Sequence, residues 1–349
     1  MVTSLATKLR RGVGLSAALG LLVACSNAGT GVAPTSAFKR PIGSPAGGPP
    51  AFALAQAPPR VPVRSGYRKS WMDPHATGPL LYISDSPVNV VLAYTWPKLR
   101  LIGNLSGLNY PQGECVDRSG NIWIANTKRS EMLEFARGSV KMIKRLKDRG
   151  QYPSGCSVSA NGDLAVANIV ARVGKGYGPG SLSIYKGAGG PPKVYSDPAF
   201  GRVFFDGYDG SGNVFLDGQD NNGAFLIAKF DGSTFTTLTV SGATINFPGA
   251  VQVTGSHVNV EDQLGSNGYS VMYETSLNGT TLTVDATAPL LDGMDCVQSY
   301  ISGKGKRQRV ICPDGVTPGI EVYKYTAGGS PVKALYRNVL SPTGAVVSP

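Results

Sequence analysis

Histidine is almost missing from this sequence of 349 residues, which contains only His75 and His257. No Gly-x-Ser-x-Gly motif occurs, so a hydrolase of the Ser-His-Asp type would depend on a serine without a recognisable motif. The sequence also lacks a Cys-x-x-Cys pair, which argues against a zinc or redox site of that kind. His257 is expected beside a surface turn, so no concentrated catalytic group is predicted.

Long apolar runs are also lacking, apart from Gly12–Ala24, which is too short to span a bilayer as a helix. This run follows three basic residues, an arrangement typical of a signal peptide, which we predict over residues 1–24. The stretch Leu22–Cys25 resembles a bacterial lipobox, in which the cysteine is lipidated and becomes the mature N-terminus. The resemblance implies export and a lipid anchor on Cys25, and Ser26 implies the outer membrane where the cell has one. The alternative is an ordinary secretory signal.

Apolar periodicity is absent from the segment that follows. Residues 25–75 are rich in Gly, Pro and Ala, a composition typical of flexible, partly extended linkers. We expect a tether between the membrane and the folded domain. An ordered arm packed on the domain is the alternative.

Acidic residues are fewer than basic ones, with 22 Asp and Glu against 33 Lys and Arg, a net charge of +11. Two basic runs, residues 141–149 (KMIKRLKDR) and 304–309 (KGKRQR), could contact anionic lipid or polymer. Because export is predicted, we expect no nucleic-acid partner.

What the sequence does contain is a repeated pattern. Residues 111–126 (PQGECVDRSGNIWIAN) and 153–168 (PSGCSVSANGDLAVAN) nearly repeat each other, each with a turn whose glycine supplies φ > 0. Equivalent glycines, separated by 42, 50, 43 and 48 residues, are Gly120, Gly162, Gly212, Gly255 and Gly303. This period, with several short strands per copy and no helical pattern, predicts a β-propeller. A β-sandwich is the alternative.

The ends of the domain predict how the ring closes. Residues 341–349 (SPTGAVVSP) match the start of a repeat, whereas residues 80–94 (LLYISDSPVNVVLAY) match a repeat without its first strand. Pairing the two would complete that repeat and remove an open sheet edge. We therefore predict an all-β fold over residues 76–349, a six-bladed β-propeller closed by pairing of its N- and C-terminal strands. Five or seven blades are the alternatives.

The first copy resembles an NHL repeat, whose pattern is Pro-x-Gly-x-x-Val-Asp-x-x-Gly-Asn, a strand, and then Asp or Asn. The residues that match are Pro111, Gly113, Val116, Asp117, Gly120, Asn121 and Asn126; later copies match more loosely. Residues 78–349 are also similar to uncharacterised bacterial surface propellers, many of them lipoproteins. NHL-type and related propellers include protein- and nucleic-acid-binding platforms and lactonases of the gluconolactonase/regucalcin type, so the fold alone selects no function.

The resemblance also implies a ligand face, made by the loops before the innermost strands and after the second strands. The candidate ligand-face residues are Glu114, Asn126, Asn168, Tyr177, Asp206, Asp217, Asp262 and Asp295. Several belong to a set that recurs once per repeat at a strand end: Asp85, Asn126, Asn168, Asp217, Asp262 and Asp314. For this set we favour a structural interpretation, in which each side chain closes its own loop.

Three carboxylates are candidate metal ligands. Glu114 and Asp206 each precede a turn glycine by six residues, and Asp295 is nearly equivalent. Oxygen donors at one level of the channel could hold Ca²⁺ or another divalent cation. The alternative is carboxylates paired with Arg or Lys, and no other cofactor is predicted.

Four cysteines remain after Cys25, and an even number in an exported chain suggests disulfides. Cys296 and Cys312 flank one predicted hairpin, whereas Cys115 and Cys156 lie on inner strands of adjacent repeats. We predict the pairs Cys296–Cys312 and Cys115–Cys156.

Two functional hypotheses follow. The first is a membrane-anchored, extracytoplasmic propeller that binds a protein, glycan or other envelope component through its loop-rich face, without catalysis. The second is a metal-dependent lactonase or related hydrolase that uses the channel carboxylates.

Overall fold

The computed structural model describes residues 67, 69–174 and 176–349. In these ranges the chain forms strands and short 3-10 segments but no α-helix; the segments are η3 (Ser86–Val88), η4 (Thr127–Arg129), η5 (Lys186–Ala188) and η6 (Gly305–Arg307). Accordingly, no helix in the described ranges is long and apolar enough to cross a membrane. The predicted signal peptide, the lipidation site Cys25 and residues 25–66 of the tether lie outside the described residues.

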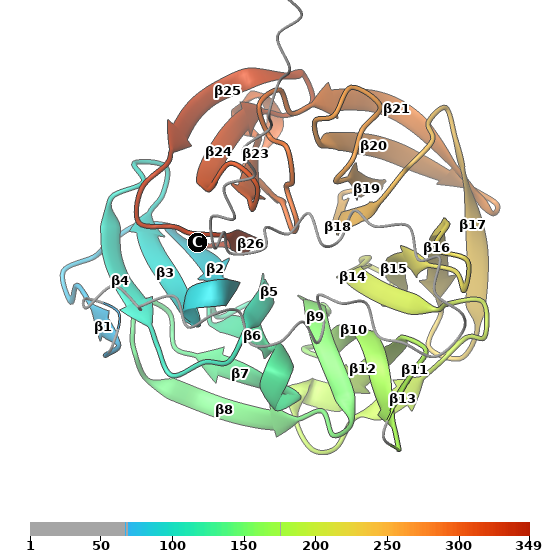
Figure 1. Cartoon of the computed structure of the whole chain (residues 1–349), viewed down its shortest axis with the longest axis horizontal. Helices are drawn as coiled ribbons and strands as arrows, with labels where there is room; N and C mark the ends of the chain where they lie inside the picture. Colours follow the sequence, from blue (N-terminus) through green and yellow to red (C-terminus); the bar gives the residue numbers. More distant parts are fainter. Residues whose placement is uncertain (1–66, 68, 175) are drawn as a thin grey trace, which may run out of the picture. The chain divides into compact units, whose positions relative to one another are not determined.

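The strands form antiparallel units of four around a central axis, and we call each unit a blade (Figure 1). The first blade, from the axis outward, consists of β26 (Pro342–Ser348), β2 (Leu80–Asp85), β3 (Val90–Thr95) and β4 (Leu101–Leu105). The second consists of β5 (Pro111–Val116), β6 (Ile122–Asn126), β7 (Glu131–Phe135) and β8 (Met142–Lys147). The third consists of β9 (Gln151–Val158), β10 (Leu164–Val173), β12 (Ser181–Tyr185) and β13 (Lys193–Tyr195), with β11 (Gly176–Gly178) paired to the end of β10.

The fourth and fifth blades are the halves of one eight-stranded sheet, joined where β17 and β21 pair in parallel. The fourth is β14 (Arg202–Tyr208), β15 (Val214–Gln219), β16 (Phe225–Phe230) and β17 (Phe235–Ser241), and the fifth is β18 (Pro248–Thr254), β19 (His257–Asp262), β20 (Val271–Asn278) and β21 (Thr281–Pro289). The sixth is β22 (Tyr300–Ser302), β23 (Arg309–Asp314), β24 (Gly319–Lys324) and β25 (Gly328–Leu335). The predicted all-β propeller fold is confirmed.

The ring closes through the last strand of the chain. β26 pairs antiparallel with β2, and its register places Val347 opposite Leu81 and Ala345 opposite Ile83. The first blade therefore takes its innermost strand from the C-terminal end and its other strands from the N-terminal end of the domain. The predicted closure by pairing of the terminal strands is confirmed.

Ordered structure extends into the range assigned to the tether. The short strand β1 (Trp71–Met72) pairs with β4 at the outer edge of the first blade. Tyr67 is also buried and packs in the same cluster as Leu81. Residues 67 and 69–75 therefore belong structurally to the propeller.

Blades stack face to face, which buries both sides of their middle strands. On β2, Tyr82 packs with Ile124 of the second blade, whereas its neighbour Ile83 packs with Ile311 of the sixth. All six residues of β2 are buried, so the strand has no solvated face. Burial of each large apolar side chain stabilises the fold by roughly 1.5–3 kcal/mol. The outer strand β8 is largely exposed.

Glycines have two structural roles in the innermost strands and their turns. The turn glycines of the repeat adopt positive φ, for example 81° at Gly120 and 92° at Gly303, as predicted. Gly113 and Gly344 instead permit close approach of neighbouring innermost strands: a Cβ on Gly113 would lie 2.2 Å from the Ser154 carbonyl oxygen, and one on Gly344 would lie 2.5 Å from that of Gln112. This contact explains the glycine of the Pro-x-Gly pattern.

Candidate functional site

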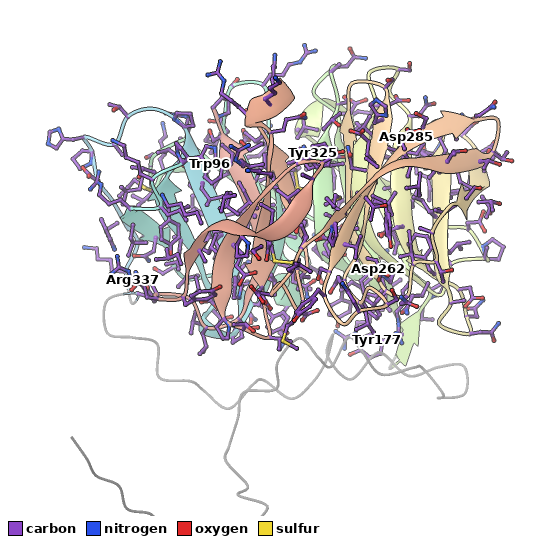
Figure 2. All side chains as sticks on the ribbon, turned by 90° about the horizontal axis from the view of Figure 1, so that it is seen from above. Trp96, Tyr177, Asp262, Asp285, Tyr325 and Arg337 are labelled. Atoms are coloured by element: carbon purple, nitrogen blue, oxygen red, sulfur yellow. A yellow bond between two sulfur atoms is a disulfide. The ribbon has the colours of Figure 1, made fainter. Side chains whose placement is uncertain are left out.

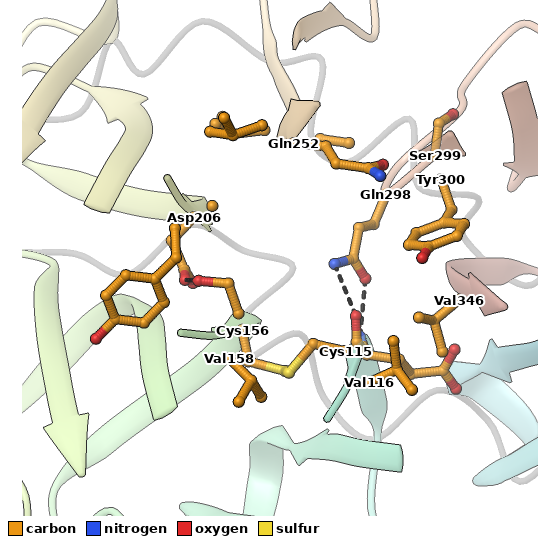
Figure 3. Close-up of a pocket in the computed structure, with 17 residues that line it drawn as sticks. Cys115, Val116, Cys156, Val158, Asp206, Gln252, Gln298, Ser299, Tyr300 and Val346 are labelled. Carbon is orange, nitrogen blue, oxygen red and sulfur yellow. Dashed lines mark hydrogen bonds between the residues drawn. A yellow bond between two sulfur atoms is a disulfide. The ribbon is translucent and has the colours of Figure 1, made fainter. Parts of the chain in front are cut away.

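The innermost strands enclose a cavity of about 160 Å³ in the channel (Figure 3). Its polar lining consists of Glu114, Ser157, Asp206, Gln252, Gln298 and Ser299. Ligand sites in proteins typically measure about 300–1,000 Å³, so this cavity is smaller than a typical ligand site.

Glu114 is held on β5 and is buried. Its Oε1 accepts a hydrogen bond of 2.8 Å from the Ser84 hydroxyl, whereas Oε2 has no partner among the described residues. Gln298 fixes the backbone, because the amide of Glu114 donates to Gln298 Oε1 and Gln298 Nε2 donates to the Glu114 carbonyl oxygen (Figure 3). Burial raises the pKa of Glu114 well above its ordinary value. The buried site therefore disfavours the charged form of this side chain.

Asp206 projects from β14 toward the same cavity. Its carboxylate accepts hydrogen bonds from the Ser157 hydroxyl at 2.5 Å and from the Ala167 amide at 3.0 Å, both in the third blade. Burial raises its pKa to about 6, against the effect of these two donors. Asp206 thus fastens the third blade to the fourth.

The three carboxylates predicted as metal ligands do not form one cluster. Glu114 and Asp206 line the cavity, whereas Asp295 lies outside its lining, next to the isolated bridge between Cys296 and Asp314. Among the residues that the structure describes, no three His, Cys, Asp or Glu side chains group closely enough to hold a metal ion. The metal site, and the lactonase chemistry that would need it, gain no support from the geometry.

The strand-end residues mostly act on the loop that leads into the innermost strand of their own blade. Asp262 accepts hydrogen bonds from the amides of Asn246 and Phe247, just before β18. Asp85 accepts from Leu340 and Ser341, just before β26. The related contacts are Asn126 with the Asn109 amide, Asp217 with the Phe205 amide and Asp314 with the Met294 amide. Asn168 differs, since its amide group donates to Ser181 and Ser183.

Most candidate ligand-face residues are therefore interior. Seven of the eight are buried, and Tyr177 on β11 is the half-buried exception. Its ring lies 5.6 Å from that of Tyr152, on the face that also carries Asp262 (Figure 2). We call this the loop face. Tyr177 belongs to β11, which pairs with β10.

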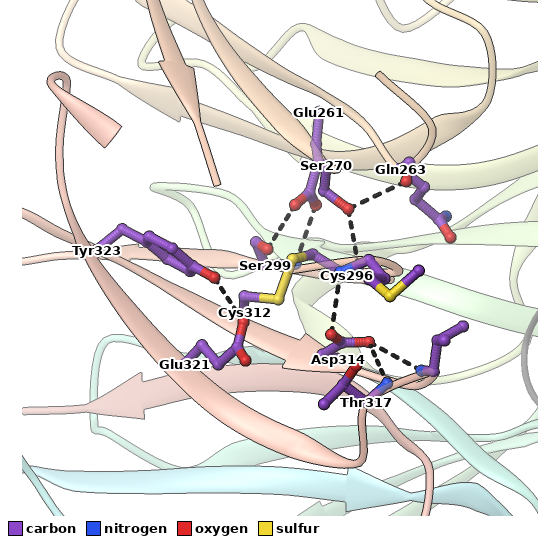
Figure 4. The surroundings of a disulfide bond; sticks show 12 residues. Glu261, Gln263, Ser270, Cys296, Ser299, Cys312, Asp314, Thr317, Glu321 and Tyr323 are labelled. Carbon is purple, nitrogen blue, oxygen red and sulfur yellow. Dashed lines mark hydrogen bonds between the residues drawn. A yellow bond between two sulfur atoms is a disulfide. The ribbon is translucent and has the colours of Figure 1, made fainter. Parts of the chain in front are cut away.

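Both predicted disulfides are confirmed. Cys115–Cys156 joins innermost strands of the second and third blades, and Cys296–Cys312 lies within the sixth. Figure 4 shows the second bridge beside Glu261, a residue that the sequence analysis missed. Glu261 is buried and accepts a hydrogen bond from the Ser299 hydroxyl, and burial raises its pKa to about 8. A charged residue among the valines of β19 was the available signal.

A larger cavity, of about 1020 Å³, opens on the opposite face, where the turns of the repeat lie. We call this the turn face; Trp96 and Tyr325 mark it in Figure 2. Side chains in the wall include Trp96, Arg118, Glu274, Tyr300, Lys304 and Gln308. Tyr300 and Gln252 also line the channel cavity, so the larger cavity is the mouth of the channel on this side.

At this mouth the acidic side chains have hydrogen-bond partners, whereas two basic side chains have no ion-pair partner. Asp117 accepts hydrogen bonds from the backbone amide and the side-chain amide of Asn121, and Glu274 accepts one of 2.8 Å from the Tyr325 hydroxyl. Arg118 and Lys304 are exposed, and neither forms an ion pair within the described ranges. The mouth therefore offers cationic donors to a ligand.

The chain matches no protein-family model and no curated protein. Solved structures do resemble it. A protein of unknown function from Bacteroides caccae superposes with a TM-score of 0.56 at 9% identity, over 78% of this chain and 99% of that one. A chain of a nidogen/laminin complex superposes with a TM-score of 0.57 at 12% identity, over 78% of this chain and 99% of that one. Similarity at this level of identity supports the β-propeller fold alone.

Proposed function

We propose that this protein is a non-catalytic binding module, held outside the cytoplasm by a lipid on Cys25, that binds a protein, glycan or other envelope component. The observation that carries the proposal is the wide mouth on the turn face. It combines a cavity of about 1020 Å³ with exposed cations that form no ion pair in the described chain. Small-molecule sites in proteins have a similar volume, about 300–1,000 Å³.

Two further observations support this proposal, the first against a catalytic role and the second for export. The candidate carboxylates Asp206, Asp217 and Asp262 are buried and accept hydrogen bonds from the backbone of their own domain. The two disulfides fit an oxidising compartment, as expected of an exported chain. The nidogen/laminin complex is a precedent for a similar fold in a protein assembly.

We assign the binding to the turn face rather than to the loop face predicted from the sequence. Seven of the eight candidate ligand-face residues are buried, so they offer little to a ligand. The alternative is a small contact around Tyr177, which is half-buried. A Tyr177→Ala variant tests that alternative directly.

The binding function is tested with full-length protein in detergent, mixed with purified envelope fractions and sedimented. We expect the wild type to sediment with one fraction and the double variant Arg118→Gln/Lys304→Gln to stay in solution. Equal sedimentation of the wild type and the double variant would place the binding elsewhere. The anchor is tested separately by labelling cells with a radioactive fatty acid: label retained by Cys25→Ser would refute lipidation at that residue.

A further inference from the structure

Four side chains at the mouth of the channel can donate hydrogen bonds to a ligand. Arg118 and Lys304 supply cationic donors, and Gln308 supplies an amide. Tyr300 adds a hydroxyl whose pKa is raised by burial, so it stays protonated and able to donate. A ligand that fits must therefore present several acceptors.

A basic hairpin forms one side of this mouth. Lys304, Lys306 and Arg307 are exposed in the loop between β22 and β23. Arg309 stabilises this loop, because its Nη1 donates hydrogen bonds to the carbonyl oxygens of Lys306 at 3.2 Å and Gln308 at 2.7 Å. The cations are thus presented on a fixed turn. An anionic partner is the complementary one.

The acidic groups that face the same cavity are already engaged. Asp117 is hydrogen-bonded to Asn121, and Glu274 to Tyr325. His257 is part of the wall, and its Nδ1 lies 3.4 Å from Asp285, which is outside the wall. In the wall, Arg118 and Lys304 are the Arg and Lys side chains, and neither forms an ion pair in the described ranges, so they remain available to an anion.

Aromatic surface is the third component. Trp96 is half-buried, packs against the core of the first and sixth blades, and lines the cavity. Tyr300 lines both this cavity and the channel below it. Aromatic rings fixed in this way offer flat apolar area at low entropic cost, next to polar groups.

We propose that the turn-face mouth binds an acidic oligosaccharide, with sugar rings against Trp96 and Tyr300 and carboxylates on Arg118 and Lys304. This inference rests on the proposed binding function and names its ligand class. A saccharide presents hydroxyls as acceptors at every ring, which suits the amide of Gln308 and the hydroxyl of Tyr300. Arginine in particular pairs with a carboxylate through two parallel hydrogen bonds.

An acidic peptide would satisfy the cations equally well but not the rest of the wall. A peptide of acidic residues has no ring hydroxyls for the neutral donors and no sugar ring to lie against Trp96 and Tyr300. The saccharide uses all three components of the mouth at once, namely the aromatic area, the neutral donors and the cations. The peptide is therefore an outcome of the test rather than a second proposal.

The test is calorimetric titration of the full-length protein with three probes: tetragalacturonate, neutral cellotetraose, and tetraglutamate. We expect tetragalacturonate to bind, and to bind more weakly as salt is added. Arg118→Gln and Lys304→Gln should each weaken it about tenfold, the effect of losing one charge-assisted hydrogen bond. Lys193→Gln is the matched control, an exposed cation on β13 far from the cavity wall, and should leave binding unchanged.

Three results would overturn the ligand class. Cellotetraose could bind as tightly as tetragalacturonate, tetraglutamate could bind more tightly than either saccharide, or the two glutamine variants could bind like the wild type. The sedimentation experiment separates these failures from failure of the function. If an envelope fraction still binds and the binding depends on Arg118 and Lys304, the binding function stands and only the saccharide ligand is refuted. If no fraction binds, both proposals are refuted.

Discussion

The Ser299 hydroxyl donates a hydrogen bond of 2.5 Å to Oε1 of Glu261, and both side chains are buried. Glu261 belongs to β19 of the fifth blade, and Ser299 directly precedes β22 of the sixth. The backbone amide of Ser299 also donates to Glu261, at 3.2 Å. One carboxyl group thus fastens two blades together in the interior.

Replacing Ser299 with alanine should destabilise the propeller. The change removes the hydroxyl donor and leaves a buried carboxyl oxygen without it, a loss of about 1–3 kcal/mol. We expect a lower midpoint in urea denaturation with an unchanged slope. Ser256→Ala, at an exposed turn position, is the control and should shift the free energy of unfolding by less than about 0.5 kcal/mol. Equal midpoints for the two variants would show that the contact contributes nothing.

Stability should fall as pH rises from 5 to 8. Burial raises the pKa of Glu261 to about 8 and those of Asp206 and Asp148 to about 6, whereas the unfolded chain keeps ordinary values. Between the unfolded and folded pKa values the native state binds more protons, so the free energy of unfolding decreases with pH. Thermal unfolding in 0.5 M salt, which screens the net positive charge, should give a higher Tm at pH 5 than at pH 8.

Glu114→Gln provides the matched variant for this pH dependence. The Ser84 hydroxyl can still donate to the amide oxygen, but no carboxyl group remains to ionise at position 114. We expect the variant to lose less Tm than the wild type between pH 5 and pH 8; each kcal/mol corresponds to roughly 2–4 °C in a domain of this size. A Tm that stays level or rises over this range in the wild type would contradict the assignment of buried neutral acids.

The disulfides should stabilise the fold to different extents. Cys115–Cys156 closes a loop of 41 residues and Cys296–Cys312 one of 16. The chain-entropy relation gives about 4 kcal/mol for the first and about 3 kcal/mol for the second. The double alanine variants, compared by urea denaturation, should follow that order. Thiol titration of the denatured, unreduced protein should find none of these four cysteines free.

Much of the fold could be predicted because the repeat contains residues with strong backbone preferences at fixed positions. Gly120 and Gly303 were identified from spacing alone, and both adopt the positive φ that a tight turn requires. The closure of the ring followed from a missing strand at one end and a surplus one at the other, and Ala345 does lie opposite Ile83. Local signals of this kind can be recognised in a single sequence.

The site was harder to predict because burial is decided by neighbouring blades. The sequence places Asp206 in the channel and Asp217 at a loop, but it does not show that both carboxylates are buried and accept hydrogen bonds from backbone amides. Glu261 alternates with the valines of β19, a pattern that indicates a solvated face, but in the propeller both faces of this strand are buried. Trp96 and Lys304 are far apart in the chain and share a cavity only after the ring has closed.

The closing strand should be intolerant of charge. Ala345 is buried opposite Ile83 of β2, in the apolar cluster that includes Ile311 of the sixth blade, so an aspartate there would be a charge without a partner in the interior. We expect Ala345→Asp to cost more than about 3 kcal/mol and to give insoluble protein, because the unpaired edge of β2 becomes available to other chains. Pro349→Asp places the same charge at an exposed position and should remain soluble. A soluble, cooperatively folding Ala345→Asp protein would argue against closure by this strand.

Asp262 separates the structural from the ligand-binding interpretation of the strand-end residues. Its carboxylate accepts from the amides of Asn246, Phe247 and Leu264 at 2.9–3.1 Å, so Asp262→Ala leaves donors unpaired at the start of β18. We expect a loss of about 2–3 kcal/mol and faster hydrogen exchange at Phe247, with a smaller loss in Asp262→Asn, which keeps one acceptor oxygen.

Asp220 is the matched control, because it accepts from the Asn222 and Ala224 amides in the same way but at an exposed turn. Asp220→Ala should cost less than about 1 kcal/mol, since water can replace the lost acceptor. Binding of envelope fractions, measured by sedimentation at a temperature where both variants are folded, should be unchanged in each. An Asp262→Ala protein as stable as the wild type but unable to bind would reverse the assignment, because the carboxylate would then serve the ligand rather than the loop.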